Sequence, residues 1–158
     1  MTIKFEGPAI MVADMQAARA FYEGLLGQEV LADFGANVPF KSGFSLWEAD
    51  HALGVIYKDG RRPPAPLGRD NVEFYFESTD LDAAWARVSA GRADVIHPIE
   101  EAPWGQRCFR VHDPDGHIVE VGEPLPTLIK RLHSQGLTAE AISARTSVPI
   151  PMVEAMLQ

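Results

Sequence analysis

Carboxylates, an arginine, a tyrosine and a histidine stand at alternate positions in three short segments of this sequence. Apolar side chains recur at every second position of residues 72–78, 106–112 and 117–121, as in strands with one buried face. The opposite face then carries the groups that could do chemistry: Glu73, Tyr75, Arg110, His112 and Glu120. Ionisable groups gathered on one sheet face predict a binding or catalytic site. A plain solvent-exposed face is the alternative, because a one-residue slip in register would reverse the assignment.

Each of these groups offers a different chemistry. Glu73 and Glu120 could accept hydrogen bonds from a ligand. Arg110 could pair with an anionic or polar group of a ligand, and Tyr75 could stack on a ring. His112 shares a face with Arg110 and could act as a general base near neutral pH, with Glu120 as the second candidate catalytic residue. The alternative for His112 is a histidine that only forms hydrogen bonds at the rim of the site.

The elements that must position these side chains repeat along the chain. Residues 14–20 (DMQAARA) return 66 residues later as residues 80–86 (DLDAAWA), with four identical positions. Asp14 and Asp80 each follow a short apolar run and open a helical pattern, and aspartate is a favoured residue at helix N-termini. The repeat predicts two copies of one unit packed together, with the functional cavity between them.

Each copy is predicted to be a β-α-β-β-β module, and the two modules form the curved sheet of one α+β domain over residues 1–123. The first module covers about residues 3–57 and the second about residues 71–122, and a proline-rich linker joins them at residues 58–70. The strands of the first module are predicted at residues 3–12, 28–34, 38–41 and 44–48. Those of the second are predicted at residues 72–78, 95–99, 107–112 and 117–122.

Residues 124–158 are predicted to form a helical C-terminal extension. Part of this segment is similar to the first half of a helix-turn-helix, but its last helix carries no lysine or arginine. Its three cations (Lys130, Arg131, Arg145) exceed its two anions (Glu140, Glu154) by only one charge. Phosphate contacts dominate affinity for DNA, so we expect no nucleic-acid partner. A packing or dimerisation arm is the favoured interpretation, and a contact surface of a ligand-sensing regulator is the alternative.

Composition and charge exclude several classes of protein. The chain of 158 residues has a formal net charge of −8, which disfavours broad attraction to nucleic acid or anionic membranes. It contains no apolar run of about 18 residues that could cross a bilayer, and residues 1–6 do not resemble a signal peptide. The single cysteine, Cys108, cannot form an internal disulfide, which fits a reducing compartment. We therefore expect a cytoplasmic protein without a membrane partner.

Several motifs resemble the vicinal oxygen chelate superfamily, which includes glyoxalase I, extradiol dioxygenases and the fosfomycin- and bleomycin-resistance proteins. They are the paired modules, residues 21–27 (FYEGLLG), residues 103–107 (PWGQR) and residues 113–120 (DPDGHIVE). The resemblance covers residues 3–122 and is specific to the fold but not to the reaction. It implies a cup-shaped site for a small molecule and a homodimer.

The resemblance also implies four cavity positions that hold a metal in some members, one on the first and one on the last strand of each module. Here Gly7 and Glu73 occupy the first-strand positions, seven residues before each helix-opening aspartate. Trp47 and Glu120 occupy the last-strand positions when the turn glycines are aligned, and Glu48 replaces Trp47 if that strand slips by one. Glycine has no ligand atom, and two carboxylates alone make a weak transition-metal site.

The sequence therefore predicts a small-molecule binding protein of the glyoxalase/bleomycin-resistance type, with no metal or a weakly bound divalent metal at Glu73 and Glu120. Trp47 and Tyr75 would stack on the ligand, and Trp104, in the loop before strand 107–112, would cover the cup. The alternative is a metal-dependent glyoxalase-like lyase, an isomerase or an extradiol-type dioxygenase, with Glu73 and Glu120 as ligands and His112 as the acid–base group.

Overall fold

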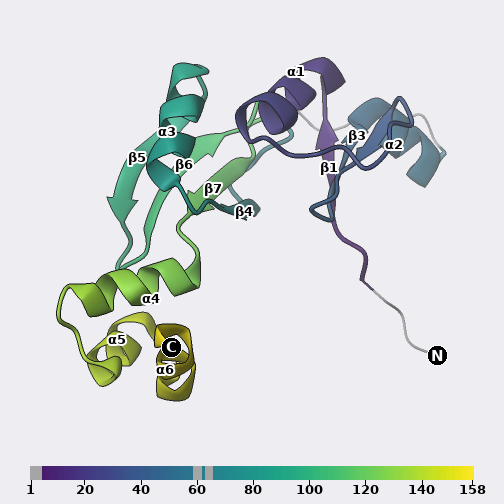
Figure 1. The fold of residues 1–158 in the computed structure, drawn as a ribbon. Coiled ribbons are helices and arrows are strands. Elements are labelled where there is room, and N and C mark those ends of the chain that lie inside the picture. The colour runs from purple at the N-terminus through teal and green to yellow at the C-terminus, as the bar shows by residue number, and fades with distance from the viewer. Residues whose placement is uncertain (1–4, 59–61, 63–65) are drawn as a thin grey trace, which may run out of the picture.

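The computed structural model of the chain describes residues 5–58, 62 and 66–158. In this part of the chain a three-stranded sheet and a four-stranded sheet combine with helices (Figure 1). The predicted α+β fold is confirmed. Residues 59–61 and 63–65 of the predicted linker at residues 58–70 lie outside the described residues.

The first module holds the smaller sheet. Its elements are β1 (Ala9–Val12), α1 (Met15–Arg19), the π-helix η1 (Ala20–Leu25), β2 (Asn37–Pro39), β3 (Ser45–Glu48) and α2 (Ala49–Tyr57). β1 pairs with β3 in parallel, and β2 pairs with β3 in antiparallel orientation.

The second module holds the larger sheet. Its elements are β4 (Glu73–Glu77), α3 (Leu81–Ala90), β5 (Asp94–Glu101), β6 (Arg107–His112) and β7 (Ile118–Gly122). β4 pairs with β7 in parallel, as β1 does with β3, so the first and last strands of each module lie side by side.

The helix starts repeat as the sequence predicts. The Asp14 carboxylate accepts a bond of 3.0 Å from the backbone N–H of Ala17, and the Asp80 carboxylate accepts one of 2.9 Å from Ala83. These side chains cap the two helices at positions 66 residues apart, and each cap satisfies a backbone donor that the helix itself leaves free.

One strand prediction for the first module is wrong, and one helix was not predicted. Residues 28–34 do not form a strand, and only Val30 forms an isolated bridge, to Phe40. Leu31 and Ala32 both donate their backbone N–H to the carbonyl of Pro39, which has no N–H to return, so a ladder does not extend here. Helix α2 was not predicted, because Gly54 and the β-branched residues after it weaken the helical signal.

Aromatic rings from both modules pack together in a shared core. The ring of Phe76 on β4 lies 5.9 Å from that of Phe44 and 6.4 Å from that of Tyr22, measured between ring centroids. Tyr22 is fully buried, and Phe44 and Phe76 belong to the same apolar cluster. Burial of these rings holds the two modules together.

A buried carboxylate, Asp113, joins the DPDG turn to the π-helix η1. It accepts bonds of 2.9 Å from the hydroxyl of Tyr22 and from the backbone N–H groups of Asp115 and His117, and the Nδ1 of His117 lies 3.0 Å away. Burial alone would raise the pKa of Asp113, but the bonds from His117 and Tyr22 outweigh it and lower that pKa. For His117 the effect of burial is the opposite, a lower pKa, but the hydrogen bond and the charge of Asp113 outweigh it and raise the pKa of His117. The turn is therefore locked by an ion pair.

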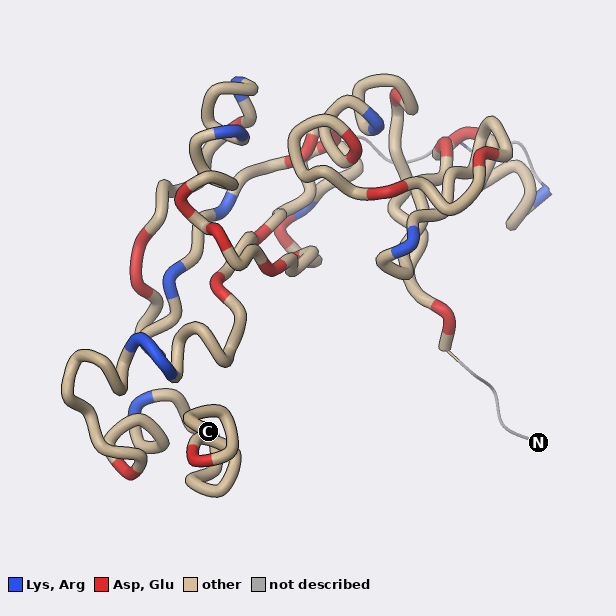
Figure 2. Tube along the Cα trace, viewed as in Figure 1, with Lys and Arg blue, Asp and Glu red and all other residues tan. Residues whose placement is uncertain are grey.

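The C-terminal extension forms a small helical unit of its own. It consists of α4 (Leu125–Ser134), α5 (Ala139–Thr146) and α6 (Ile150–Leu157). Apolar side chains from all three helices form a separate core of Leu128, Ile129, Leu132, Ile142 and Val153. Figure 2 shows the basic positions of α4 and α5 close to the end of the larger sheet. No helix in the described part of the chain is long and apolar enough to cross a membrane.

We predict that replacing His117 with glutamine changes stability in a pH-dependent way. Because its folded-state pKa is raised, His117 contributes its full stabilisation below about pH 6.5 and loses it as the pH rises through the raised value. His117→Gln should therefore cost roughly 1 kcal/mol at pH 6 and much less at pH 9, as measured by urea unfolding. His133→Gln, at an exposed position on α4, is the matched control. A cost of the His117 variant that does not change with pH would contradict this account.

Candidate functional site

The predicted polar face lies on the larger sheet, where three neighbouring strands carry its members. Tyr75 on β4 and Arg110 on β6 are both register partners of Glu120 on β7, which lies between them. Glu120 is only 3% exposed, whereas Glu73 and Tyr75 are exposed. The structure therefore brings together Glu73, Tyr75, Arg110 and Glu120.

The guanidinium of Arg110 is the centre of this face. Its Nε donates to Glu73 at 2.7 Å, and its Nη2 donates to Glu120. Its Nη1 lies 3.1 Å from the Nε2 of His97 and 3.7 Å from the sulfur of Cys108. These contacts with the protein engage the donors that we expected a ligand to meet. We call this set of five side chains the Arg110 cluster.

His97 and Cys108 are members of the Arg110 cluster that were not among the predicted site residues, and His97 was missed because of an irregular strand. Register shifts in β5 between Val95 and His97, and between His97 and Glu100, bring His97 opposite Arg110. Such bulges turn a side chain to the other face and interrupt the alternation on which the prediction rested. Pro98 directly after His97 was the available signal, because proline within a strand indicates an edge or a bulge.

Burial and charge shift the protonation of the Arg110 cluster. Burial raises the pKa of Glu120; the charge of Arg110 opposes this shift, and that of Glu73 adds to it. Burial works against the charge of Arg110, but the bond that Arg110 donates to Glu73 and the charge of Glu120 raise the pKa of Arg110. Burial raises the pKa of the Cys108 thiol to about 11, so the thiol is protonated and a poor nucleophile at neutral pH.

Two aromatic side chains, Tyr75 and Trp104, form what we call the aromatic wall. Tyr75 is the register partner of Glu120, so the wall lies beside the Arg110 cluster. The hydroxyl of Tyr75 donates to Glu77 at 3.0 Å and accepts from the side-chain amide of Gln106 at 2.8 Å. The indole N–H of Trp104 donates to Gln106 at 3.0 Å. Burial raises the pKa of Tyr75 to about 12. The ring lies against Gly122, where an added Cβ would come within 3.2 Å of it.

The C-terminal extension supports this wall. The guanidinium of Arg131 on α4 donates to the carbonyl of Gly105 at 2.5 Å and to the buried Glu123 at 2.6 Å. Glu123 also accepts from the backbone N–H of Arg107, and its carbonyl accepts from Gln106. Hydrogen bonds therefore connect the extension, through Gln106, to Tyr75 and Trp104.

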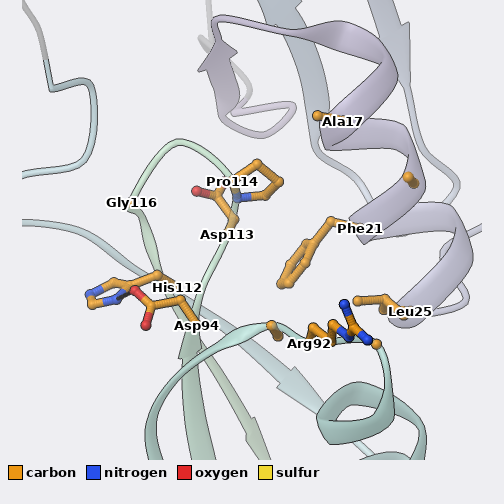
Figure 3. A pocket seen from close by; sticks show the side chains of 12 residues that line it. Ala17, Phe21, Leu25, Arg92, Asp94, His112, Asp113, Pro114 and Gly116 are labelled. Carbon is orange, nitrogen blue, oxygen red and sulfur yellow. Dashed lines mark hydrogen bonds and ion pairs between the residues drawn. The ribbon is translucent and has the colours of Figure 1, made fainter.

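His112 lies at the end of β6, away from the Arg110 contacts. Its Nδ1 is 2.8 Å from a carboxylate oxygen of Asp94, and its Nε2 is 3.8 Å from Asp70. Both His112 and Asp94 border a cavity of about 620 Å³ between the modules. Figure 3 shows Phe21 and Leu25 of η1 on one side of this cavity, with the imidazole of His112 pointing away from them.

The first module has no counterpart of the Arg110 cluster. Gly7 precedes β1 and has a φ of +123°, and a Cβ there would lie 1.8 Å from the carbonyl oxygen of Gly43. The backbone packing therefore leaves no room for any side chain at this position. Among the described residues, no group of three or more His, Cys, Asp or Glu side chains is arranged to hold a metal ion.

The predicted equivalence of Trp47 and Glu120 is wrong. Ala9 pairs with Ser45, and Tyr75, 66 residues after Ala9, pairs with Glu120, so Ser45 is the equivalent of Glu120. Aligning the turn glycines gives the wrong equivalence, because Ser45 follows Gly43 by two residues whereas Glu120 follows Gly116 by four. Trp47 lies on the smaller sheet, and its indole N–H donates to His51 at 2.9 Å.

Comparison with known proteins agrees with this architecture. The sequence matches the glyoxalase-like domain family over residues 5–126. The chain belongs to this family. The glyoxalase-like domain thus accounts for both modules, and the predicted membership in the vicinal oxygen chelate superfamily is confirmed.

Solved structures with this fold include two from Agrobacterium tumefaciens. One, of a protein of unknown function, is 39% identical, has a TM-score of 0.73 and covers 79% of this chain and 97% of its own. The other, a lactoylglutathione lyase, is 27% identical, has a TM-score of 0.59 and covers 78% and 95%. An uncharacterised protein of Mycobacterium bovis is 36% identical over 62 residues, and this match spans 41% of that relative's length.

We predict that Gly7 tolerates no side chain. Gly7→Ala should lower the free energy of unfolding by roughly 3 kcal/mol, because it combines a strained φ with a collision against the backbone. Gly35→Ala is the matched control: its φ is +74°, but nothing lies within 4 Å of an added Cβ, so it should cost only about 1 kcal/mol. Denaturant unfolding measures both values, and equal costs would contradict the proposed close approach.

Proposed function

We propose that this glyoxalase-like domain binds a small molecule on the open face of the larger sheet, without a resident metal ion. The observation that carries the proposal is the Arg110 cluster and its aromatic wall, a built polar site on an accessible sheet face. Tyr75 is 47% and Trp104 41% exposed, so both rings are available to a ligand although hydrogen bonds fix their hydroxyl and indole groups. Rings held in this way provide contact area at low entropic cost.

The charges on this face favour a ligand with hydrogen-bond donors or a positive charge. Arg110 is engaged by Glu73 and Glu120, and Glu77 beside Tyr75 is exposed. Carboxylates therefore outnumber available cations on the face. A ligand with a flat ring and a cationic or donor-rich group would stack on the aromatic wall and bond to the carboxylates.

The residues present do not fit the divalent metal that the resemblance implies. Gly7 has no ligand atom, and its surroundings admit no side chain. Glu73 and Glu120 carry a guanidinium between them, which would repel a metal ion at ligand distance. The proposed function therefore uses no metal ion.

A second candidate function is proton transfer by His112, with Glu120 as its expected companion. The contact of the His112 Nδ1 with Asp94 favours this candidate, because a carboxylate at one ring nitrogen orients a histidine as a general base. Such a site fits a lyase or isomerase that uses no metal. Binding remains the primary proposal, because Glu120 is buried and bonded to Arg110.

We also propose a homodimer in a reducing, cytoplasmic environment. Large apolar side chains of the first module are exposed, among them Leu31 at 65% and Phe34 at 71%, and a second copy would cover such surface.

Cys108 is a buried free thiol, which supports the proposed reducing environment. Arg131 and Arg145 are engaged in ion pairs with Glu123 and Glu101, which supports docking of the extension rather than nucleic-acid binding.

We predict that the site prefers a planar aromatic cation to the matching anion. Benzamidinium should shift the indole signal of Trp104 and the ring signals of Tyr75 in NMR titrations, and benzoate should not. Glu77→Gln should weaken benzamidinium binding about fivefold, because it removes one charge-assisted contact. Glu140→Gln on α5 is the control. Equal binding of benzoate, or shifts confined to other residues, would contradict the proposal.

A further inference from the structure

Four side chains of types that bind metals in proteins surround the guanidinium of Arg110. Two are the carboxylates of Glu73 and Glu120, one is the imidazole of His97 and one is the thiol of Cys108. Carboxylate oxygen, imidazole nitrogen and cysteine sulfur are the donors that zinc and related cations take. All four approach one positive charge, which in this chain belongs to the protein itself.

The orientation of His97 supports this comparison. Its Nδ1 lies 2.8 Å from the carbonyl oxygen of Pro98, which can only accept, so Nδ1 carries the proton. Nε2 therefore presents its lone pair, and the Nη1 of Arg110 lies 3.1 Å from it. Metal-binding histidines are oriented in the same way, by a carbonyl or carboxylate at the nitrogen that does not bind the cation.

We propose that Arg110 is a built-in cation that holds the place of a divalent metal ion and excludes it. The formal charges explain the exclusion. Glu73, Glu120 and Arg110 sum to −1, so a bound dication would bring the total to +1 and stand beside a guanidinium. Without Arg110, the charges of the two carboxylates and of a bound dication would sum to zero. This inference shares its sheet face with the proposed function, but it requires no organic ligand.

Replacing the guanidinium of Arg110 with a metal ion would require the donor side chains to move. The donors now lie at hydrogen-bond distance from a guanidinium, so each would have to close in to about 2.0–2.3 Å to bind a metal. The side chain of Glu73 is 40% exposed and has room to move, whereas that of Glu120 is 4% exposed and fixed by its burial. Glu120 is therefore the anchor of the latent metal site, and Glu73 and His97 would move toward it.

Titration with Co²⁺ alone tests the proposal. Arg110→Ala should bind one Co²⁺ per chain about a hundredfold more tightly than the unaltered protein, because the ion no longer has to displace a paired guanidinium. Calorimetry measures the affinity, and the visible absorption of Co²⁺ reports the ligands, including any bond from Cys108. Arg107→Ala, on the same strand but paired with Asp82, is the matched control and should gain no affinity. Adding Glu120→Gln to Arg110→Ala should abolish the gain.

Two results with folded proteins would overturn the proposal. One is stoichiometric, Glu120-dependent Co²⁺ binding by the unaltered protein, and the other is a folded Arg110→Ala variant without increased affinity. If Arg110→Ala does not fold alone, circular dichroism should show that Co²⁺ restores its fold. The proposal is also overturned if Co²⁺ does not restore this fold although Arg110→Ala/Glu120→Gln is folded. Loss of benzamidinium binding would bear on the proposed function and leave this result standing.

Discussion

A carboxylate that is buried in a sheet needs a cation beside it, and Glu120 has Arg110. This requirement organises the open face of the larger sheet. Arg110 on β6 pairs with Glu120 on the neighbouring β7, and its remaining donors contact Glu73 on β4 and His97 on β5. The aromatic wall stands next to this charged centre, so a ligand on the face would meet rings and carboxylates together.

The two modules share a frame but not a site. Matching aspartate caps and matching parallel pairs repeat at the same interval, whereas the positions equivalent to Glu73, Tyr75 and Glu120 are Gly7, Ala9 and Ser45. Gly7 is fixed by its approach to Gly43, so the first module uses this position for backbone packing. The chemistry of the chain is therefore concentrated in the second module, and the C-terminal extension is attached to that module.

Local signals predicted most of the second module. Alternation placed Glu73, Arg110 and Glu120 on one face, because these strands carry no irregularity at those positions. His97 escaped prediction because the bulges of β5 depend on its pairing with β6 and not on its own sequence pattern. The equivalent of Glu120 was misplaced for a related reason: turn glycines mark where a hairpin bends, but the register is set by the neighbouring strand. Ion-pair partners likewise require the folded sheet.

The most direct test of the account is a crystal structure of the unaltered protein grown with Mn²⁺, with anomalous scattering recorded to locate the metal. The account predicts the guanidinium of Arg110 between Glu73 and Glu120, with no anomalous peak within ligand distance of either carboxylate. A manganese peak bound by Glu120, with the side chain of Arg110 turned away, would contradict it.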